Sequence, residues 1–163
     1  MTVYTHNRIL PVATENIPEE LKSRPQWVVW KAVGEKLSKV PYSPKDSLRA
    51  STTDLMTWST FEEALGVYEC GEYAGVGFVF SSGDPYTGID LDACVNEESG
   101  EVTGWAMEIV RYFDSYTEVS ATSTGLHIIV RGEMPNRRIG NVEVYSSKRF
   151  FTVTGHVLEV SGD

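Results

Sequence analysis

Short runs of β-branched and aromatic residues recur along the whole sequence, and they limit the possible folds more than any other feature. Residues that favour turns, chiefly Gly, Pro, Ser and Asp, separate these runs. The predicted strands cover residues 27–30, 75–80, 86–92, 116–120, 125–131, 142–145, 150–153 and 156–160. Residues 36–46 contain Pro41 and Pro44 and therefore predict a loop or an edge strand.

Two further segments have the pattern of helices. Residues 59–60, a Ser-Thr pair, are followed three positions later by Glu62 and Glu63, which is the pattern of a capping box at a helix start. Apolar residues at helical intervals predict a second helix within residues 103–113. A turn at residues 81–85 lies between two predicted strands and favours a hairpin. Together these segments predict an α+β fold with a mixed or antiparallel sheet.

The length and composition are those of a globular protein. The 163 residues predict a single domain over residues 1–163, because no linker is long enough to divide it. Hydrophobic residues make up 41% and charged residues 23%, which excludes a disordered or fibrous chain. No apolar run approaches the ~18 residues of a membrane span, so no membrane partner is expected. Cys70 and Cys94 lack the spacing of metal ligands and suit a reducing compartment, which predicts a cytoplasmic protein.

The net charge of −9 is unevenly distributed along the chain. Residues 54–118 hold fourteen acids and one base. Residues 31–49 and residues 131–149 each hold five bases and two acids. If the two basic segments fold onto one side, an anion-binding site exists on an acidic protein. The alternative is that both segments are solvated loops.

A pair of acids in one predicted strand suggests a metal site. Asp90 and Asp92 lie two residues apart, so both point to the same face of the strand, while Ile89 and Leu91 point to the core. Two carboxylates about 4 Å apart repel by roughly 4 kcal/mol at an effective dielectric constant of 20. A hard divalent cation such as Mg²⁺ or Mn²⁺ relieves that repulsion. The alternative is an edge strand that faces solvent.

Glu143 is a third acid on an alternating strand, where it shares a face with Tyr145. If this strand lies next to the strand of Asp90, Glu143 completes a cluster of three carboxylates. Such a cluster can hold two metal ions, which activate an attacking oxygen and stabilise a leaving pyrophosphate. An ordinary exposed glutamate is the alternative.

A turn rich in hydroxyl groups precedes the strand of His127. Backbone amides and the hydroxyls of Thr122 and Ser123 can bind phosphate oxygens, and Gly125 allows a close approach of the backbone. His127 alternates with apolar neighbours, so it faces away from them. A single histidine in such a strand is more often a structural hydrogen-bonding group, but beside carboxylates and a phosphate-binding turn it becomes a candidate ligand for phosphate.

Three basic residues are further candidates for phosphate binding. Arg149 offers a planar fork of donors for a triphosphate. Lys31 and Lys39 could line a channel for template or nucleotide, or could be solvated. The sequence has no Gly-x4-Gly-Lys-Ser/Thr motif, so a P-loop ATPase is excluded.

Taken in order, several motifs resemble the bifunctional primase-polymerase domain of phages and plasmids, in the archaeo-eukaryotic primase superfamily. The segments that carry the resemblance are 17–31, 39–42, 50–53, 75–78, 88–92 (Gly-Ile-Asp-Leu-Asp), 115–120, 125–127 (Gly-Leu-His), 143–145 (Glu-Val-Tyr) and 149–155. The resemblance covers about residues 17–155 and includes no helicase domain.

The resemblance implies template-directed nucleotidyl transfer from a dNTP or NTP to a 3′-hydroxyl on a single-stranded or primed DNA template. It implies a palm related to RNA-recognition domains, joined to a small N-terminal α/β unit. It assigns two ions of Mg²⁺ or Mn²⁺ to Asp90, Asp92 and Glu143. It assigns phosphate contacts to His127 and Arg149, and also to Lys31 and Lys39. Tyr42, beside Lys39, is a candidate for contact with the sugar.

The sequence departs from the family pattern in three ways. Residues 120–123 are Ser-Ala-Thr-Ser, where the family usually has Ser-Pro-Ser-Gly. Residues 132–141 are short, where many relatives have a longer loop or a zinc-binding element. Relatives often continue into a helical domain and a helicase, which here are expected in trans or deleted, so primer extension is favoured over priming. The alternatives are a metal-dependent phosphodiesterase and a non-catalytic nucleotide- or DNA-binding module.

Overall fold

The computed structural model describes residues 9–159, and within them the chain forms two antiparallel sheets and a few helices. The strands are β1 (Trp27–Val33), β2 (Ser38–Tyr42), β3 (Gly75–Phe80), β4 (Tyr86–Leu91), β5 (Tyr116–Val119), β6 (Leu126–Arg131), β7 (Arg137–Ile139), β8 (Val142–Tyr145) and β9 (Arg149–Val153). The helices are α2 (Glu19–Lys22), α3 (Phe61–Glu69), α4 (Gly104–Phe113) and the short 3-10 helices η1 (Thr14–Asn16) and η2 (Leu55–Thr57). The predicted α+β class is confirmed.

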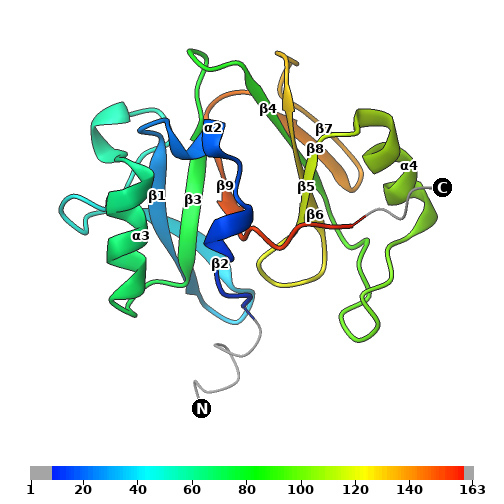
Figure 1. Ribbon diagram of the computed structural model, residues 1–163, viewed down its shortest axis with the longest axis horizontal. Coiled ribbons are helices and arrows are strands. Elements are labelled where there is room, and N and C mark those ends of the chain that lie inside the picture. The colour runs from blue at the N-terminus through cyan, green and yellow to red at the C-terminus, as the bar shows by residue number, and fades with distance from the viewer. Residues whose placement is uncertain (1–8, 160–163) are drawn as a thin grey trace.

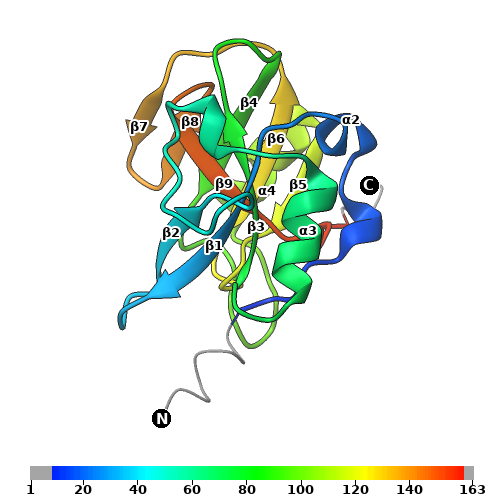
Figure 2. The same ribbon diagram turned by 90° about the vertical axis from the view of Figure 1, so that its left-hand side faces the viewer.

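The four-stranded sheet has the order β2-β1-β3-β9, and the five-stranded sheet has the order β5-β6-β4-β8-β7. Every strand pair in both sheets is antiparallel. Helix α3 lies beside the four-stranded sheet and α4 lies at the opposite side of the molecule, so the sheets stand between them (Figure 1). The view from the side shows α3 running along the face of β1 and β3 (Figure 2). No helix within residues 9–159 is long and apolar enough to cross a membrane.

Helix α3 starts where the capping pattern predicts. The hydroxyl of Thr60 accepts a hydrogen bond from the backbone N–H of Glu63, and the carboxylate of Glu63 accepts one from the hydroxyl of Ser59. Phe61 in the first turn then packs edge-on against Trp27 of β1, with ring centroids 4.8 Å apart. The cap therefore fixes the start of the helix that covers the four-stranded sheet.

Alternation along β4 and β6 divides their side chains between two faces. One face is apolar and packs on α4 through Ile89, Leu91, Leu126, Ile128, Ala106 and Val110. The other face holds Asp90 and His127 and points toward the four-stranded sheet. The two sheets approach closely at Gly88, where an added Cβ would lie 2.5 Å from ring carbons of Phe80 and Phe151.

The predicted hairpin between β3 and β4 is wrong, because the two strands belong to different sheets. Both edges of β3 are already paired, one with β1 and the other with β9. The chain therefore crosses from one sheet to the other at residues 81–85. The carboxylate of Asp84 stabilises the crossing by accepting hydrogen bonds from the backbone N–H groups of Ser81 and Tyr86 and from the side-chain amide of Gln26.

Two other segments differ from expectation and one agrees with it. Residues 156–159 form only an isolated bridge, between Val157 and Glu118, and Val160 lies outside the described residues. Strand β7 was not predicted, because its three residues are all exposed and show no apolar alternation. The expectation of a loop or edge strand at residues 36–46 is confirmed, since β2 lies at the edge of its sheet and contains Pro41.

Candidate metal and phosphate site

Five polar side chains form a single row across the five-stranded sheet. In strand order the row is Glu118, His127, Asp90, Glu143 and Arg138, each directly opposite its neighbour in the pairing register. Directly paired residues of antiparallel strands point to the same face. We call this set the charged row. The pairing of β4 with β8 therefore places Glu143 beside Asp90.

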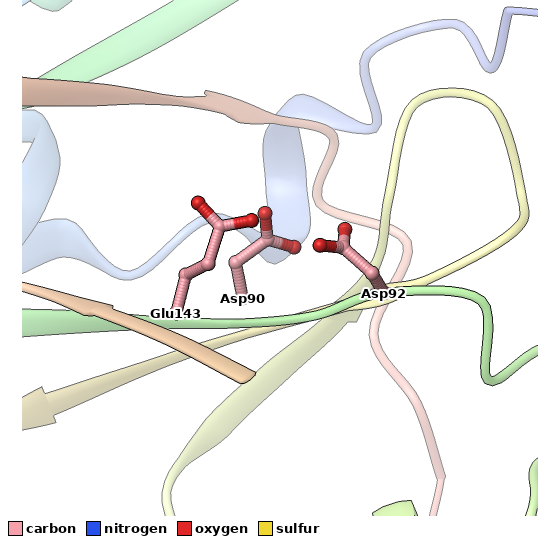
Figure 3. Close-up of side chains that lie close together, drawn as sticks. All are labelled: Asp90, Asp92 and Glu143. Atoms are coloured by element: carbon pink, nitrogen blue, oxygen red, sulfur yellow. The ribbon is translucent and has the colours of Figure 1, made fainter. Parts of the chain in front are cut away.

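The three predicted carboxylates lie together. One oxygen from each of Asp90, Asp92 and Glu143 can be chosen so that all lie within 4.8 Å of one another. Asp92 follows β4 directly, and its backbone N–H donates to the carbonyl of Asn141 at 2.8 Å, which extends the pairing beyond the strand. The three side chains point toward one another above the sheet (Figure 3). The geometry that alternation predicted is therefore present.

The carboxylates have unequal affinities for protons. Burial, followed by the charges of Asp90 and Glu143, raises the pKa of Asp92 to about 6. Burial alone would also raise the pKa of Glu143, but a hydrogen bond from Tyr145 and the positive charge of Arg149 hold it below its usual value. Near neutral pH the cluster therefore concentrates negative charge that a cation would stabilise.

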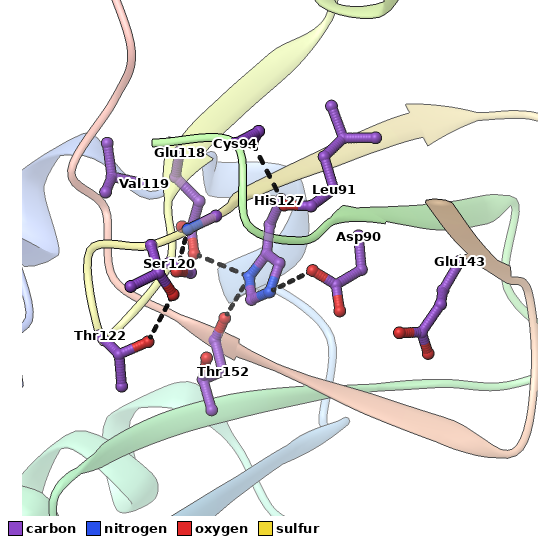
Figure 4. A network of polar contacts seen from close by, with 12 residues as sticks. Asp90, Leu91, Cys94, Glu118, Val119, Ser120, Thr122, His127, Glu143 and Thr152 are labelled. Atoms are coloured by element: carbon purple, nitrogen blue, oxygen red, sulfur yellow. Dashed lines mark hydrogen bonds and ion pairs between the residues drawn. The ribbon is translucent and has the colours of Figure 1, made fainter. Parts of the chain in front are cut away.

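His127 is buried between two carboxylates (Figure 4). Its Nε2 lies 3.5 Å from Oδ1 of Asp90, and its Nδ1 lies 3.5 Å from Oε2 of Glu118 and 3.0 Å from the carbonyl oxygen of Thr152. The ring stacks on Phe151, with centroids 4.6 Å apart. Burial lowers the pKa of His127, but the hydrogen bond that its ring donates to Glu118 and the charge of Asp90 more than offset this, so the pKa is raised.

A hydrogen-bonded chain connects Arg149 to the carboxylate cluster. The guanidinium donates to the hydroxyl of Tyr145 at 2.7 Å, and that hydroxyl donates to Oε1 of Glu143 at 2.7 Å. The guanidinium also lies over the ring of Tyr145, 4.3 Å from its centroid. Sequence reasoning gave Tyr145 no role, although the alternation that places it on the face of Glu143 was a usable signal.

A cavity of about 560 Å³ opens above this part of the charged row. Its lining residues are Lys39, Pro41, Ala50, Ser51, Thr52, Asp90, His127, Glu143, Tyr145, Lys148, Arg149, Phe150, Phe151 and Thr152. Acids and an imidazole thus share the cavity with three cations and four hydroxyl side chains. Such a mixture suits a ligand that carries both phosphates and a bound cation. Lys148, Ser51 and Thr52 were not predicted individually, although residues 50–53 belong to a motif of the resemblance.

The hydroxyl-rich turn lies outside the lining of this cavity. The hydroxyls of Thr122 and Thr124 are 3.2 Å apart, and Ser123 has a φ of 66°. A Cβ on Gly125 would lie 2.5 Å from the carbonyl oxygen of Leu91, so the turn packs tightly on the end of β4. Contacts of Thr122, Ser123 and Gly125 with phosphate remain predictions.

Lys31 and Tyr42 are not brought to the cavity. Lys39 and Pro41 line the cavity, and alternation places Val40 and Tyr42 on the opposite face of β2. Lys31, paired with Val40, shares that opposite face. There its Nζ lies 5.1 Å from the ring centroid of Tyr42 and 5.0 Å from that of Tyr73, an arrangement typical of cation–π packing.

These features define an α+β protein whose antiparallel sheet presents a carboxylate cluster, a buried histidine and flanking cations to one cavity. No protein-family model matches the chain. The chain is 36% identical over 147 residues to the DNA primase-polymerase of Nitratiruptor phage NrS-1. The match covers 85% of this chain and 20% of the phage protein, so the chain spans about one fifth of the relative's length. This similarity supports a phage primase-polymerase-like domain, as the sequence motifs indicate.

Proposed function

We propose that this domain is a template-directed DNA nucleotidyltransferase that joins nucleoside triphosphates to a 3′-hydroxyl. The observation that carries the proposal is the charged row, which brings Asp90, His127 and Glu143 to directly paired positions beneath one cavity. The relative named a DNA primase-polymerase supports the same conclusion. We further propose that the five-stranded sheet acts as a primase-like palm.

The donor set of the cluster fits a hard divalent cation. Asp90, Asp92 and Glu143 offer only carboxylate oxygens, which Mg²⁺ and Mn²⁺ prefer. We propose that these three residues hold the two ions expected from the resemblance. When bound, the ions would lower the pKa of an attacking 3′-hydroxyl and neutralise charge on the triphosphate.

The other side chains of the cavity bind and orient the triphosphate. Arg149 presents a guanidinium fork that Tyr145 holds in place from below. His127 directs Nε2 toward Asp90 at the edge of the cavity, where a phosphate oxygen could accept a hydrogen bond. Lys39 lines the same cavity and adds a positive charge to it. Because these groups are already in position, catalysis relies on orientation and electrostatic stabilisation.

The same proposal includes the partners of the reaction. These are a single-stranded or primed DNA template, a dNTP or NTP as substrate, and a helicase or helical priming domain as a further partner. Primer extension needs only the cavity and its cluster, whereas starting a new strand requires two nucleotides to be held together. We therefore propose extension as the primary activity of this domain.

The test is a primer–template assay with a labelled primer, Mg²⁺ or Mn²⁺, and dNTPs or NTPs. Extended primers are expected from the unmodified protein, and Asp90→Asn is expected to lower the rate at least about a hundredfold, since several kcal/mol of charge stabilisation is lost. Glu108→Gln, an equivalent change at an exposed position of α4, is the control and should extend normally.

Other products would contradict the proposal in distinguishable ways. Shortened primers without any need for triphosphates would identify a phosphodiesterase that uses the same carboxylates. Binding of triphosphate in calorimetry without extension or cleavage would identify a non-catalytic binding module. Full activity in Asp90→Asn, with the fold confirmed by circular dichroism, would show that the cluster is not the reactive site.

A further inference from the structure

Glu118 lies at one end of the charged row and has no place in the proposed chemistry. Its side chain is fully buried, with 0% of the residue exposed. A buried carboxylate is costly unless it is paired and hydrogen-bonded. Oε1 meets this need by accepting hydrogen bonds from the hydroxyl of Tyr116 at 2.7 Å and from the backbone N–H groups of Thr154 and Gly155 at 3.0 and 3.1 Å.

The other oxygen of Glu118 faces His127. Oε2 accepts a hydrogen bond from the N–H of Thr154 at 3.0 Å and lies 3.5 Å from Nδ1 of the imidazole. The carbonyl oxygen of Thr152 lies 3.0 Å from the same nitrogen. Two acceptors at Nδ1 require that this nitrogen carries a proton, because a lone pair there would face oxygen lone pairs. The ring is thereby oriented with Nε2 toward Asp90 and the cavity.

Glu118 also helps to position the carbonyl group of Thr152, which is the other acceptor at Nδ1 of His127. Thr154 and Gly155 follow β9 directly, and Thr152 lies within β9. Glu118 accepts hydrogen bonds from the backbone N–H groups of Thr154 and Gly155, and so connects the end of the four-stranded sheet to β5 of the five-stranded sheet. The carbonyl of Thr152 is therefore kept at a fixed distance from the imidazole. Figure 4 shows Glu118 and Thr152 both directed at His127.

We propose that Glu118 is a positioning residue, which holds the imidazole of His127 so that Nε2 meets the triphosphate of the incoming nucleotide. The proposal rests on the proposed function, and it extends the site to a residue that never touches substrate. It requires that a change at Glu118 alter the use of the triphosphate selectively, while the binding of primer and template is preserved.

Glu118→Gln tests this requirement, because the amide keeps one acceptor oxygen and replaces the other with a donor that opposes the N–H of Nδ1. The KM for the nucleoside triphosphate is expected to rise at least about tenfold, as for loss of one hydrogen bond to a charged group. The KM for primer–template should stay unchanged. Glu108→Gln, which makes the same change on an exposed helix face, should match the unmodified protein in both.

Nitrogen NMR of His127, recorded without metal or nucleotide, tests the orientation without any activity. The unmodified protein should show a proton on Nδ1, and Glu118→Gln should show a shift of the Nδ1 resonance, because the amide replaces the acceptor that faces this nitrogen. If the unmodified protein extends no primer, the proposed function fails, but this spectrum still decides the role of Glu118. Identical ring resonances in both proteins would overturn the positioning role.

Two further variants separate positioning from a purely structural role. In a His127→Asn background, Glu118→Gln should leave the KM for triphosphate unchanged, because the residue acts through the imidazole. An equal rise in both backgrounds, or an equal rise in the KM for triphosphate and for primer–template, would overturn the proposal. Should Glu118→Gln not fold, Glu118→Asp keeps the charge one methylene further from Nδ1 and is expected to give the same selective rise.

Discussion

At the scale of single residues, Asp92 differs from its neighbours in how readily it takes up a proton. It lies one residue beyond β4, and the charges of Asp90 and Glu143 act on it together with burial. For Glu143, the hydrogen bond from Tyr145 and the positive charge of Arg149 stabilise the ionised form, so its pKa is lowered. The cluster therefore contains one carboxylate that can exchange a proton for a cation near neutral pH.

This difference predicts opposite effects of acid on metal binding and on stability. As the pH falls from 7 to 5, the proton on Asp92, whose pKa is about 6, should weaken divalent-cation binding about tenfold. Without metal, the free energy of unfolding should rise over the same range relative to Asp92→Asn, because the folded state binds a proton that the unfolded state, with a pKa of 3.8, releases. Calorimetry and urea denaturation measure the two effects.

The comparison with Asp92→Asn removes the contribution of the titrating groups that do not interact with Asp92. If metal affinity were equal at pH 5 and pH 7, Asp92 would not be a ligand that must lose a proton. If the two proteins showed the same change in stability with pH, the raised pKa of Asp92 would be contradicted.

At the scale of elements, alternation along β1 and β2 decides which lysine can reach a substrate. Residues 39 and 41 of β2 face the cavity, while Lys31 lies on the opposite face over Tyr42 and Tyr73. The sequence analysis proposed both lysines as candidates, and the alternation of residues within each of their strands could be seen in the sequence. The face that becomes the cavity wall depends on the approach of β9 and the loop of residues 50–52, which no local pattern contains.

Lys39→Ala and Lys31→Ala form a matched pair that tests this assignment. Removing Lys39 should raise the KM for nucleoside triphosphate about fivefold, which is the ~1 kcal/mol of an exposed ionic contact. Removing Lys31 should leave that KM unchanged and lower the free energy of unfolding by about 1 kcal/mol through two lost cation–π contacts. Steady-state kinetics and urea denaturation distinguish the variants, and the reverse pattern would mean that the substrate binds on the other face.

The sequence was most informative where a local rule was sufficient. Strand alternation predicted that Asp90 and Asp92 share a face, and the capping pattern predicted the start of α3. The hairpin prediction failed because β3 finds partners far along the chain on both edges. Glu118 gave no signal because its burial depends on Thr154, which is 36 residues away. Local sequence patterns therefore could not predict which distant segments of the chain pair with one another.

At the scale of the whole molecule, a net charge of −9 coexists with a small basic surface at the cavity. Only Lys39, Lys148 and Arg149 supply positive charge among the residues that line it. Acids outnumber bases in the chain as a whole, so under the proposed function nucleic acid is expected to bind at this place.

Binding of single-stranded DNA should consequently depend only moderately on salt. Without nucleoside triphosphate, contacts of DNA phosphates with these three cations predict a slope on the order of −2 in a plot of log affinity against log salt concentration. Fluorescence anisotropy with a labelled oligonucleotide measures the slope, and Lys148→Ala should reduce its magnitude by about 0.7. A much steeper slope would reveal a wider basic surface than the three residues of the cavity.

The charged row also determines which changes in length the domain can tolerate. Its five members meet because of strand pairing, so the connecting segments can lengthen or shorten without disturbing them. One residue inserted inside β4, β6 or β8 would reverse the in-and-out phase of every position that follows, sending an acid or the imidazole into the apolar layer under α4. Scanning the domain with single-residue insertions and deletions should therefore give inactive variants for changes inside these three strands and active variants for changes between them.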